Sequence, residues 1–406
     1  MSLQDVASAE RIHIGFFGMR NAGKSSLVNA VTGQKLSVVS DVKGTTTDPV
    51  KKAMELLPLG PVLIIDTPGL DDEGELGSLR VEKAEQILEQ INIAVLVLDG
   101  TKGIQQLDAE LIRRFQSRNL PYLIAYNKAD LLAEKPVLSG KALYVSAATG
   151  KGVHELKERL GEFAQSARNP RCIISDLVEP GDVVVLVIPV DESAPKGRLI
   201  MPQQMTIREL LDVHAIPVCC QDTELPETLA KLAVKPRMVI TDSQAFGRVS
   251  RDTPKEIPLT SFSILMARYK GDLETLISGA YTLAHLKDGD KVLISEGCTH
   301  HRQCKDIGTV KIPGWIEAFS GSKPEYTFTS GNEFPDDLTP FRLVVHCGGC
   351  MLNEAAMKHR VRKTVNAGVP IVNYGVAIAH MNGILRRSLE LFPDMLKRLT
   401  DGTETN

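Results

Sequence analysis

Runs of apolar residues alternate, along the first part of the chain, with stretches whose apolar positions repeat at helical spacing. The segments Ile12–Phe17 and Ile93–Leu98 are each six residues long and mostly apolar, which is typical of strands buried on both faces. Between later runs, Leu107, Leu111 and Phe115 lie on one face of a predicted helix. This alternation predicts a parallel sheet covered by helices on both sides, and therefore an α/β fold.

The alternating pattern stops at the end of a first predicted domain, residues 1–170, and then restarts twice. Residues 171–260 predict a small middle α/β domain without a glycine-rich phosphate turn, which we interpret as a structural or oligomerisation module. Residues 261–406 predict a third α/β domain, and its last amphipathic helix is expected over residues 384–399. The sequence thus predicts three domains.

Composition and charge narrow the class of protein. Of 406 residues, 43% are hydrophobic and 24% are charged, which is ordinary for a globular protein. The 47 Lys and Arg nearly balance 50 Asp and Glu, so the net charge of −3 provides no bulk attraction to nucleic acid. No apolar run approaches the roughly 18 residues that span a bilayer, and the N-terminus has no signal-peptide pattern. We therefore expect a cytoplasmic protein that binds neither nucleic acid nor membrane.

A glycine-rich turn follows the first predicted strand. Residues 18–25, GMRNAGKS, match the pattern G-x-x-x-x-G-K-[ST] between a strand and a helix. The glycines of such a loop let backbone N–H groups surround phosphate oxygens at the helix N-terminus. We expect Lys24 to neutralise the β- and γ-phosphates and the Ser25 hydroxyl to bind Mg²⁺. The loop therefore predicts a nucleoside triphosphate site.

Further motifs follow in the order that is typical of a GTPase. Asp66-Thr-Pro-Gly69 ends a predicted strand, where Asp66 reaches Mg²⁺ and the Gly69 amide senses the γ-phosphate. Asn127-Lys-Ala-Asp130 ends another strand, and a carboxylate there accepts the two N–H donors of guanine that adenine lacks. Ser146-Ala-Ala follows the last strand of this domain, where it is expected to contact the guanine O6. These motifs select GTP over ATP and predict a GTPase.

A threonine-rich segment, Gly44-Thr-Thr46-Thr-Asp48, lies between the first helix and the next strand, as a nucleotide switch loop does. We expect the Thr46 hydroxyl to join Ser25 and Asp66 as a ligand of Mg²⁺ while the γ-phosphate is present. The residues predicted to contact the nucleotide are Gly18, Asn21, Ala22, Gly23, Lys24, Ser25, Ser26, Asp66, Gly69, Asn127, Lys128, Asp130, Ser146 and Ala147.

Over about 160 residues, these motifs resemble the TrmE/Era/Der group of translation-factor-like GTPases, in which a G-T-T-x-D switch and an Asn in the phosphate loop are typical. The resemblance implies that Asn21 helps to bind K⁺ beside the phosphates; the alternative is an Asn that only stabilises a turn. Leu70 follows Gly69, at the position where Ras-like enzymes carry the glutamine that orients water. We therefore expect slow hydrolysis that depends on a cation or a partner.

Cysteine and histidine residues gather in the last predicted domain. Cys298-x-His300 and His346-Cys347-x-x-Cys350 each follow a predicted strand. Because parallel strands bring their carboxyl ends to one edge of a sheet, we expect the two half-motifs to meet there. Three cysteines with histidine suit either Zn²⁺ or an iron–sulfur cluster, and the spacing alone leaves both open.

The whole chain is similar to the HydF family of FeFe-hydrogenase maturation GTPases, in the order of its domains and in the pattern C-x-H…H-C-x-x-C. The resemblance implies that Cys298, Cys347 and Cys350 hold a 4Fe–4S cluster with one exchangeable iron site. It also implies that His300 and His346 either supply the fourth ligand or contact the ligands without binding iron themselves. It also implies a homodimer that carries the hydrogenase's two-iron subcluster, with radical-SAM maturases and the apo FeFe-hydrogenase as partners. The last domain is then an iron–sulfur cluster domain.

Two other interpretations start from the same motifs. A ribosome- or RNA-associated GTPase with a zinc-stabilised tail would carry a basic tail, whereas residues 261–406 hold 17 Lys and Arg against 16 Asp and Glu. An electron-transfer module coupled to GTP would need a fourth thiolate. Cys304 is close enough in sequence to supply it, but we expect Cys304 to be a buried thiol that binds no metal.

Overall fold

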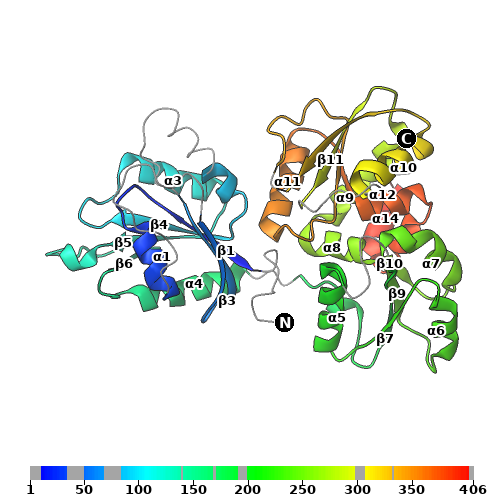
Figure 1. The fold of residues 1–406 in the computed structure, drawn as a ribbon, viewed down its shortest axis with the longest axis horizontal. Helices are drawn as coiled ribbons and strands as arrows, with labels where there is room; N and C mark the ends of the chain where they lie inside the picture. Colours follow the sequence, from blue (N-terminus) through cyan, green and yellow to red (C-terminus); the bar gives the residue numbers. More distant parts are fainter. Residues whose placement is uncertain are drawn as a thin grey trace. The chain divides into compact units, whose positions relative to one another are not determined.

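The computed structural model divides the chain into two compact units, Met1–Pro170 and Arg171–Asn406 (Figure 1). Each unit has its own sheets and its own apolar core. The residues that the structure describes are 11–33, 50–67, 84–138, 140–167, 171–190, 199–297, 307–331 and 333–401.

The described part of the first unit holds one six-stranded sheet in the order β2-β3-β1-β4-β5-β6. All neighbouring strands are parallel except β2, which pairs antiparallel with β3 at the edge. The strands are β1 (Ile12–Phe17), β2 (Val50–Leu56), β3 (Gly60–Asp66), β4 (Ile93–Asp99), β5 (Tyr122–Asn127) and β6 (Ala142–Tyr144).

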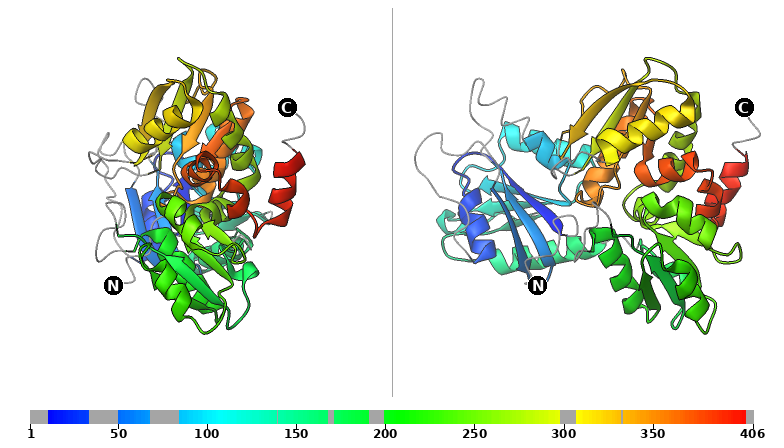
Figure 2. Two further views of the ribbon diagram at one scale, coloured as in Figure 1. Left: turned by 90° about the vertical axis from the view of Figure 1, so that its right-hand side faces the viewer. Right: turned by 45° about the vertical axis from the view of Figure 1, so that its right-hand side comes forward.

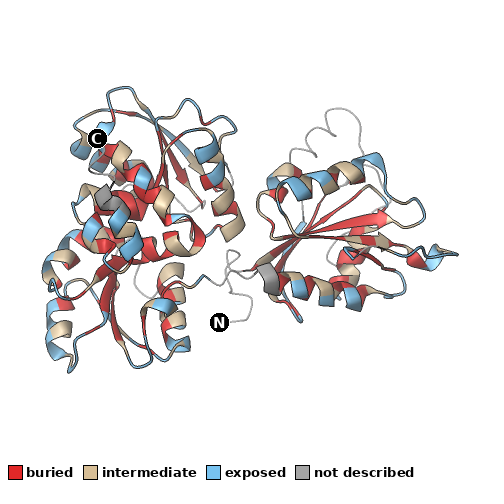
Figure 3. Cartoon of the chain, turned by 180° about the vertical axis from the view of Figure 1, so that it is seen from behind, coloured by how far each residue is buried: buried red, intermediate tan, exposed pale blue. Residues whose placement is uncertain are grey.

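Helices cover both faces of this sheet because its central strands are apolar on both faces. Helices α1 (Lys24–Thr32) and α4 (Val153–Ala167) pack on one face, where Val95 and Val97 of β4 point, and α3 (Gln106–Ser117) packs on the other, with Leu96. Figure 3 shows the buried strand residues between the two helical layers. The predicted sheet with helices on both sides is therefore what forms.

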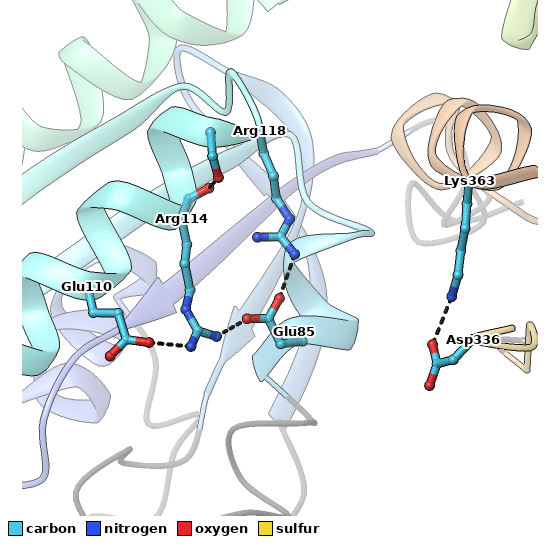
Figure 4. Close-up of polar contacts among 7 residues, drawn as sticks. Glu85, Glu110, Arg114, Arg118, Asp336 and Lys363 are labelled. Carbon is cyan, nitrogen blue, oxygen red and sulfur yellow. Dashed lines mark hydrogen bonds and ion pairs between the residues drawn. The ribbon is translucent and has the colours of Figure 1, made fainter. Parts of the chain in front are cut away.

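An ion-pair network links α3 to the preceding helical turn on the same face. Glu85 accepts hydrogen bonds from Arg114 and from Arg118, the latter at 2.6 Å, and Arg114 also pairs with Glu110 (Figure 4). These side chains are 29–44% exposed, so solvent screens the pairs and each contributes little to stability. The network therefore orients α3 more than it stabilises the domain.

The second unit contains two four-stranded, fully parallel sheets in its described residues. The first has the order β10-β9-β7-β8 and the second has the order β12-β11-β13-β14. The strands are β7 (Val183–Val187), β8 (Ile216–Cys220), β9 (Met238–Thr241), β10 (Leu259–Ser261), β11 (Lys291–Glu296), β12 (Glu325–Ser330), β13 (Leu343–His346) and β14 (Ile371–Asn373).

One continuous apolar core, running from Ile173 to Phe392, joins the two sheets of the second unit. Helices α8 and α12 lie between the sheets (Figures 1 and 2). Because this core is uninterrupted, a domain boundary at residues 260 and 261 stays a prediction. The helices are α5 (Met201–Asp212), α6 (Leu225–Lys231), α7 (Phe246–Asp252), α8 (Phe262–Lys270), α9 (Leu273–Ala280), α10 (Ile312–Ser320), α11 (Glu354–Asn366), α12 (Tyr374–Met381), α13 (Leu385–Ser388) and α14 (Pro393–Asp401).

The single helix expected over residues 384–399 is wrong. The segment forms two helices, α13 and α14, and Pro393 begins the second of them. Proline has no N–H to donate and its ring clashes with the carbonyl four residues earlier, so it breaks a helix interior but is tolerated in the first turn. Apolar spacing alone did not reveal this break.

Two edge strands, β2 and β12, were also not predicted from the apolar runs. Most residues of both strands are exposed or half-buried, so neither forms a continuous apolar run. In the described residues, no helix is both long enough and apolar enough to cross a membrane.

Helix α9 packs directly on β14, and this contact makes a stability prediction. A Cβ added at Gly279 would lie 2.0 Å from the backbone oxygen of Ile371. We expect Gly279→Ala to destabilise the second unit by about 1–3 kcal/mol through overpacking, although alanine is the better helix former. Urea denaturation followed by circular dichroism measures the effect. Ser278→Ala, at the exposed neighbouring position, is the control and should stay within about 0.5 kcal/mol; equal stability of the two variants would contradict the prediction.

Candidate functional site

The glycine-rich turn lies between β1 and α1, as the motif predicts. Both of its glycines have backbone conformations that exclude other residues. Gly18 has φ +144° and Gly23 has φ +86°. A Cβ at Gly18 would lie 2.2 Å from the carbonyl oxygen of Val97, and a Cβ at Gly23 would lie 2.2 Å from Asn127 Nδ2. The turn is thus pressed against the ends of β4 and β5, with its N–H groups at the start of α1.

Lys24 is buried within this turn. Its Nζ donates to the carbonyl oxygens of Gly18 at 3.0 Å and Met19 at 3.3 Å. The ammonium is therefore held beside the backbone that would surround the phosphates, where it adds a positive charge to the helix N-terminus. Asn21 is exposed in the same turn with φ +60°, and Ser26 is half-buried in the first turn of α1.

Ser25 and Asp66 form the oxygen pair expected for Mg²⁺. The Ser25 hydroxyl donates to Asp66 Oδ2 at 2.7 Å, although the two residues belong to different motifs. Asp66 Oδ1 is buried and has no hydrogen-bond partner within the described residues. A buried carboxylate oxygen beside a hydroxyl matches the hard oxygen ligands that Mg²⁺ prefers. The donor set therefore fits the ion. Thr46 and Gly69 lie outside the described residues.

Asn127 connects three motifs of the nucleotide site through one buried side chain. Its Nδ2 donates to Ala22 O at 2.9 Å, and its Oδ1 accepts from Ala147 N at 3.0 Å. The amide therefore ties the phosphate turn to the loop after β6, across more than a hundred residues of sequence. Its role here is to hold the phosphate-binding and base-binding segments at a constant separation.

The carboxylate predicted to recognise guanine is exposed and ionised. A hydrogen bond from the Ser146 hydroxyl lowers the pKa of Asp130, and so does a hydrogen bond from its own backbone. Lys128, with φ +60°, turns its ammonium to Asp99 Oδ2 at 2.6 Å. The described parts of the sequence motifs thus come together at the carboxyl ends of β1, β3, β5 and β6.

The strands that precede the two cysteine motifs are neighbours in the second sheet of the second unit. Strands β11 and β13 are parallel neighbours, with Ser295 in register with His346. Beyond them, the Gly297 N–H donates to Cys347 Sγ at 3.0 Å. Gly297 is the residue before Cys298 in the sequence. Cys298 and His300, and Cys304 with them, lie outside the described residues.

The two thiols of the Cys347–Cys350 loop have different surroundings. Cys347 Sγ also accepts from Gly349 N at 3.3 Å, so two backbone N–H groups point at this sulfur. Burial raises the pKa of the Cys350 thiol, and so does Cys347, whereas the positive charge of Lys270 lowers it. Gly349 has φ +61°, and a Cβ there would meet Met357 Sδ at 2.5 Å. Within the described residues, the turn therefore places two cysteines, Cys347 and Cys350, beside a glycine that tolerates no side chain.

His346 is fully buried behind the loop, and both of its ring nitrogens contact protein atoms. Arg360 NH1 lies 2.9 Å from Nε2, and the Cys347 carbonyl oxygen lies 2.7 Å from Nδ1. Because a guanidinium only donates, Nε2 accepts and Nδ1 carries the proton. In this arrangement His346 orients the Cys347 backbone from behind the thiols.

Arg360 of α11 is a residue of this site that sequence reasoning missed. It is 4% exposed, and it donates to Ser295 Oγ at 3.3 Å and to Gly331 O at 2.6 Å as well as to His346. Its guanidinium lies 5.0 Å from the centre of the Phe334 ring. One buried cation therefore connects the ends of three neighbouring strands. Its residue type does not distinguish it from the exposed Arg362 or the half-buried Lys358 and Lys363 of the same helix.

Comparison with known families gives the identity of the second unit. Residues 274–391 match the hydrogen maturase F tetramerization domain, and residues 173–271 match the hydrogen maturase F dimerization domain. The chain belongs to the hydrogen maturase F family. Residues 13–128 match the model described as a 50S ribosome-binding GTPase. The predicted family and the α/β fold with an N-terminal P-loop GTPase domain are confirmed.

Single relatives match the GTPase domain. The tRNA modification GTPase MnmE of Nitrosomonas europaea is 33% identical over 156 residues, which are 37% of this chain and 34% of that protein. GTPase Der of Kosmotoga olearia is 30% identical over 190 residues, 42% of this chain and 43% of that protein. The chain thus spans about a third to two fifths of the length of these curated relatives.

Two solved structures match this chain with low TM-scores. The G domain of the T. maritima FeoB iron transporter is 24% identical with a TM-score of 0.30, covering 38% of this chain and 100% of that one. Aquifex aeolicus Era bound to GDP.AlF4− is 18% identical with a TM-score of 0.34, covering 80% of this chain and 94% of that one.

The hydrogen bonds of Arg360 predict that it stabilises the second unit. Arg360→Met should lower the free energy of unfolding by about 2–4 kcal/mol, because it leaves His346 Nε2 and Gly331 O buried without this donor. Arg362→Met, at an exposed position on the same helix, is the matched control and should change stability by less than about 0.5 kcal/mol. Urea denaturation of both variants measures the difference. The role assigned to Arg360 is incorrect if the two variants unfold at the same urea concentration.

Proposed function

We propose that the chain is a GTP-hydrolysing scaffold that binds a 4Fe–4S cluster, and that assembles and delivers the two-iron subcluster precursor to FeFe-hydrogenase. The observation that carries the proposal is the backbone contact from Gly297 to Cys347 Sγ, which joins two cysteine motifs inside a hydrogen maturase F chain. Cys298, Cys347 and Cys350 would hold the cluster. Its three thiolates would leave one iron open to exchange, so that a second iron unit can dock and leave.

Different residues of the first unit would bind the phosphates, the guanine base and the metal ions. Lys24 and the turn amides would bind the phosphates, and Asp130 would accept the donors of guanine. Ser25 and Asp66, with Thr46, would hold Mg²⁺, which bridges phosphate oxygens and neutralises charge when bound. Asn21 would add a K⁺ ligand, and Leu70 supplies no side chain that can orient water. Slow, potassium-stimulated hydrolysis follows.

The proposed function also includes an oligomeric state and partner proteins. The matches to a dimerization and a tetramerization domain support an oligomer built on residues 173–271 and 274–391. We propose a cytoplasmic homodimer as the basic unit, with the radical-SAM hydrogenase maturases and the apo FeFe-hydrogenase as partners. Nucleotide state in the first unit would alter how the cluster-bearing unit docks with them.

Potassium dependence tests the role of Asn21. GTP turnover by the wild-type chain should be several-fold faster in KCl than in NaCl at equal ionic strength, because Asn21 would hold the larger cation beside the phosphates. Asn21→Gly keeps a residue that tolerates φ +60° and removes only the side-chain ligand, so it should abolish the difference. Equal wild-type rates in the two salts would remove K⁺ from the proposal and leave Asn21 as a turn residue.

Anaerobic reconstitution with iron and sulfide tests the cluster. The wild-type chain should take up about four irons and give an electron paramagnetic resonance signal after reduction. Cys350→Ala and Cys298→Ala should each lose most of both. Cys219→Ser changes an exposed cysteine of β8 and should keep them. A colourless protein that binds only zinc would instead support the interpretation of a zinc-stabilised tail.

A further inference from the structure

A second buried cation, Lys270, contacts the cysteine loop. Lys270 is the last residue of α8 and is 3% exposed. Its Nζ donates to three backbone carbonyl oxygens of the loop: Gly349 at 3.1 Å, Cys350 at 3.2 Å and Leu352 at 2.9 Å. Since an ammonium has three N–H donors, these contacts match its whole donor set.

Gly349 connects Lys270 to the thiol of Cys347, because it contacts both. Gly349 accepts from Lys270 through its carbonyl and donates its own N–H to Cys347 Sγ at 3.3 Å. Leu352 N also donates to Gly349 O at 3.0 Å, which closes the turn. A loop whose carbonyls converge on one ammonium has its N–H groups directed elsewhere, here toward sulfur. Lys270 therefore acts on the thiol environment through the backbone.

Lys270 also crosses between two parts of the protein. It lies at the end of the segment that matches the dimerization domain, residues 173–271, whereas the loop lies in the segment that matches the tetramerization domain, residues 274–391. The buried faces of α8 belong to the continuous core of the second unit, so the helix cannot shift without repacking. The ammonium is consequently a rigid link from the helix to the loop.

We propose that Lys270 is a positioning residue of the cluster site, which holds the Cys347–Leu352 backbone in its thiol-directing conformation and couples that conformation to the dimerization domain. The part of the proposal that concerns the cluster rests on the proposed function; the part that concerns the loop does not. A second consequence is electrostatic. A buried positive charge beside a thiolate-bound cluster favours the reduced form, which carries one more negative charge.

Hydrogen–deuterium exchange of the metal-free protein tests the loop. Lys270→Met should raise the exchange rates of the Gly349 and Leu352 amides by about tenfold or more, because their backbone loses its three-point support. Lys311→Met is the matched control. Lys311 Nζ donates to Gln244 Oε1 at 2.9 Å, so it joins the same two family segments without touching the loop, and it should leave these amides unchanged. Equal exchange in both variants would overturn the proposal.

Redox titration of the reconstituted protein tests the charge. Lys270→Met should shift the reduction potential of the cluster to a more negative value and alter its paramagnetic signal, whereas Lys270→Arg keeps the charge and should shift the potential less. Equal shifts in the Arg and Met variants would overturn the electrostatic part. If the wild-type chain binds no cluster, the proposed function fails, while the exchange result still decides the role of Lys270 in the loop.

A folding control accompanies both measurements. Circular dichroism and gel filtration compare Lys270→Met with Lys311→Met. If Lys270→Met does not fold, Lys270→Gln carries the same exchange test, because its shorter side chain has only two N–H donors and cannot make all three hydrogen bonds. Faster exchange of the loop amides in that variant supports the proposal, and unchanged exchange overturns it.

Discussion

The parallel alignment of buried strands is the constraint on which both candidate sites depend. A strand that is apolar on both faces has no room for polar chemistry along its length, so functional groups gather where strands end. In the first unit, Asp66 and Asn127 are the last residues of β3 and β5. In the second unit, His346 is the last residue of β13, and the first cysteine motif begins just beyond β11. The same physical arrangement thus serves a nucleotide site in one unit and a thiol site in the other.

Each site is completed by buried polar side chains that connect distant segments. Asn127 joins the phosphate turn to the loop after β6, and Arg360 joins the ends of three strands behind the cysteine loop. Such groups are stable in a low-dielectric interior only when their hydrogen bonds are satisfied, and satisfied networks hold one arrangement in preference to others. The geometry that the substrate or cluster meets is therefore set before it binds.

The cysteine loop differs from the phosphate turn in what supports it. Local glycines pressed against neighbouring strands shape the phosphate turn, whose own Lys24 contacts its carbonyls. The cysteine loop has one required glycine, Gly349. Lys270 of α8 contacts the loop directly, and Arg360 of α11 contacts His346, the residue that precedes it. The geometry of a site supported from several elements responds to rearrangement of any of them.

The sequence by itself determined the local chemistry. The glycine turn, the guanine motif, the cysteine spacing and the central strands can be read from it, because each depends on only a few consecutive residues. Pro393 is also a local signal for a helix break. The apolar periodicity over residues 384–399 nevertheless predicted one continuous helix. Only the tertiary structure decided that Lys270 and Arg360 serve the cysteine loop. A lysine or arginine on a helix has the same local pattern whether it faces solvent or a buried carbonyl. The contacts of Lys270 with the loop span about 80 residues of sequence, and no local spacing encodes contacts of that length.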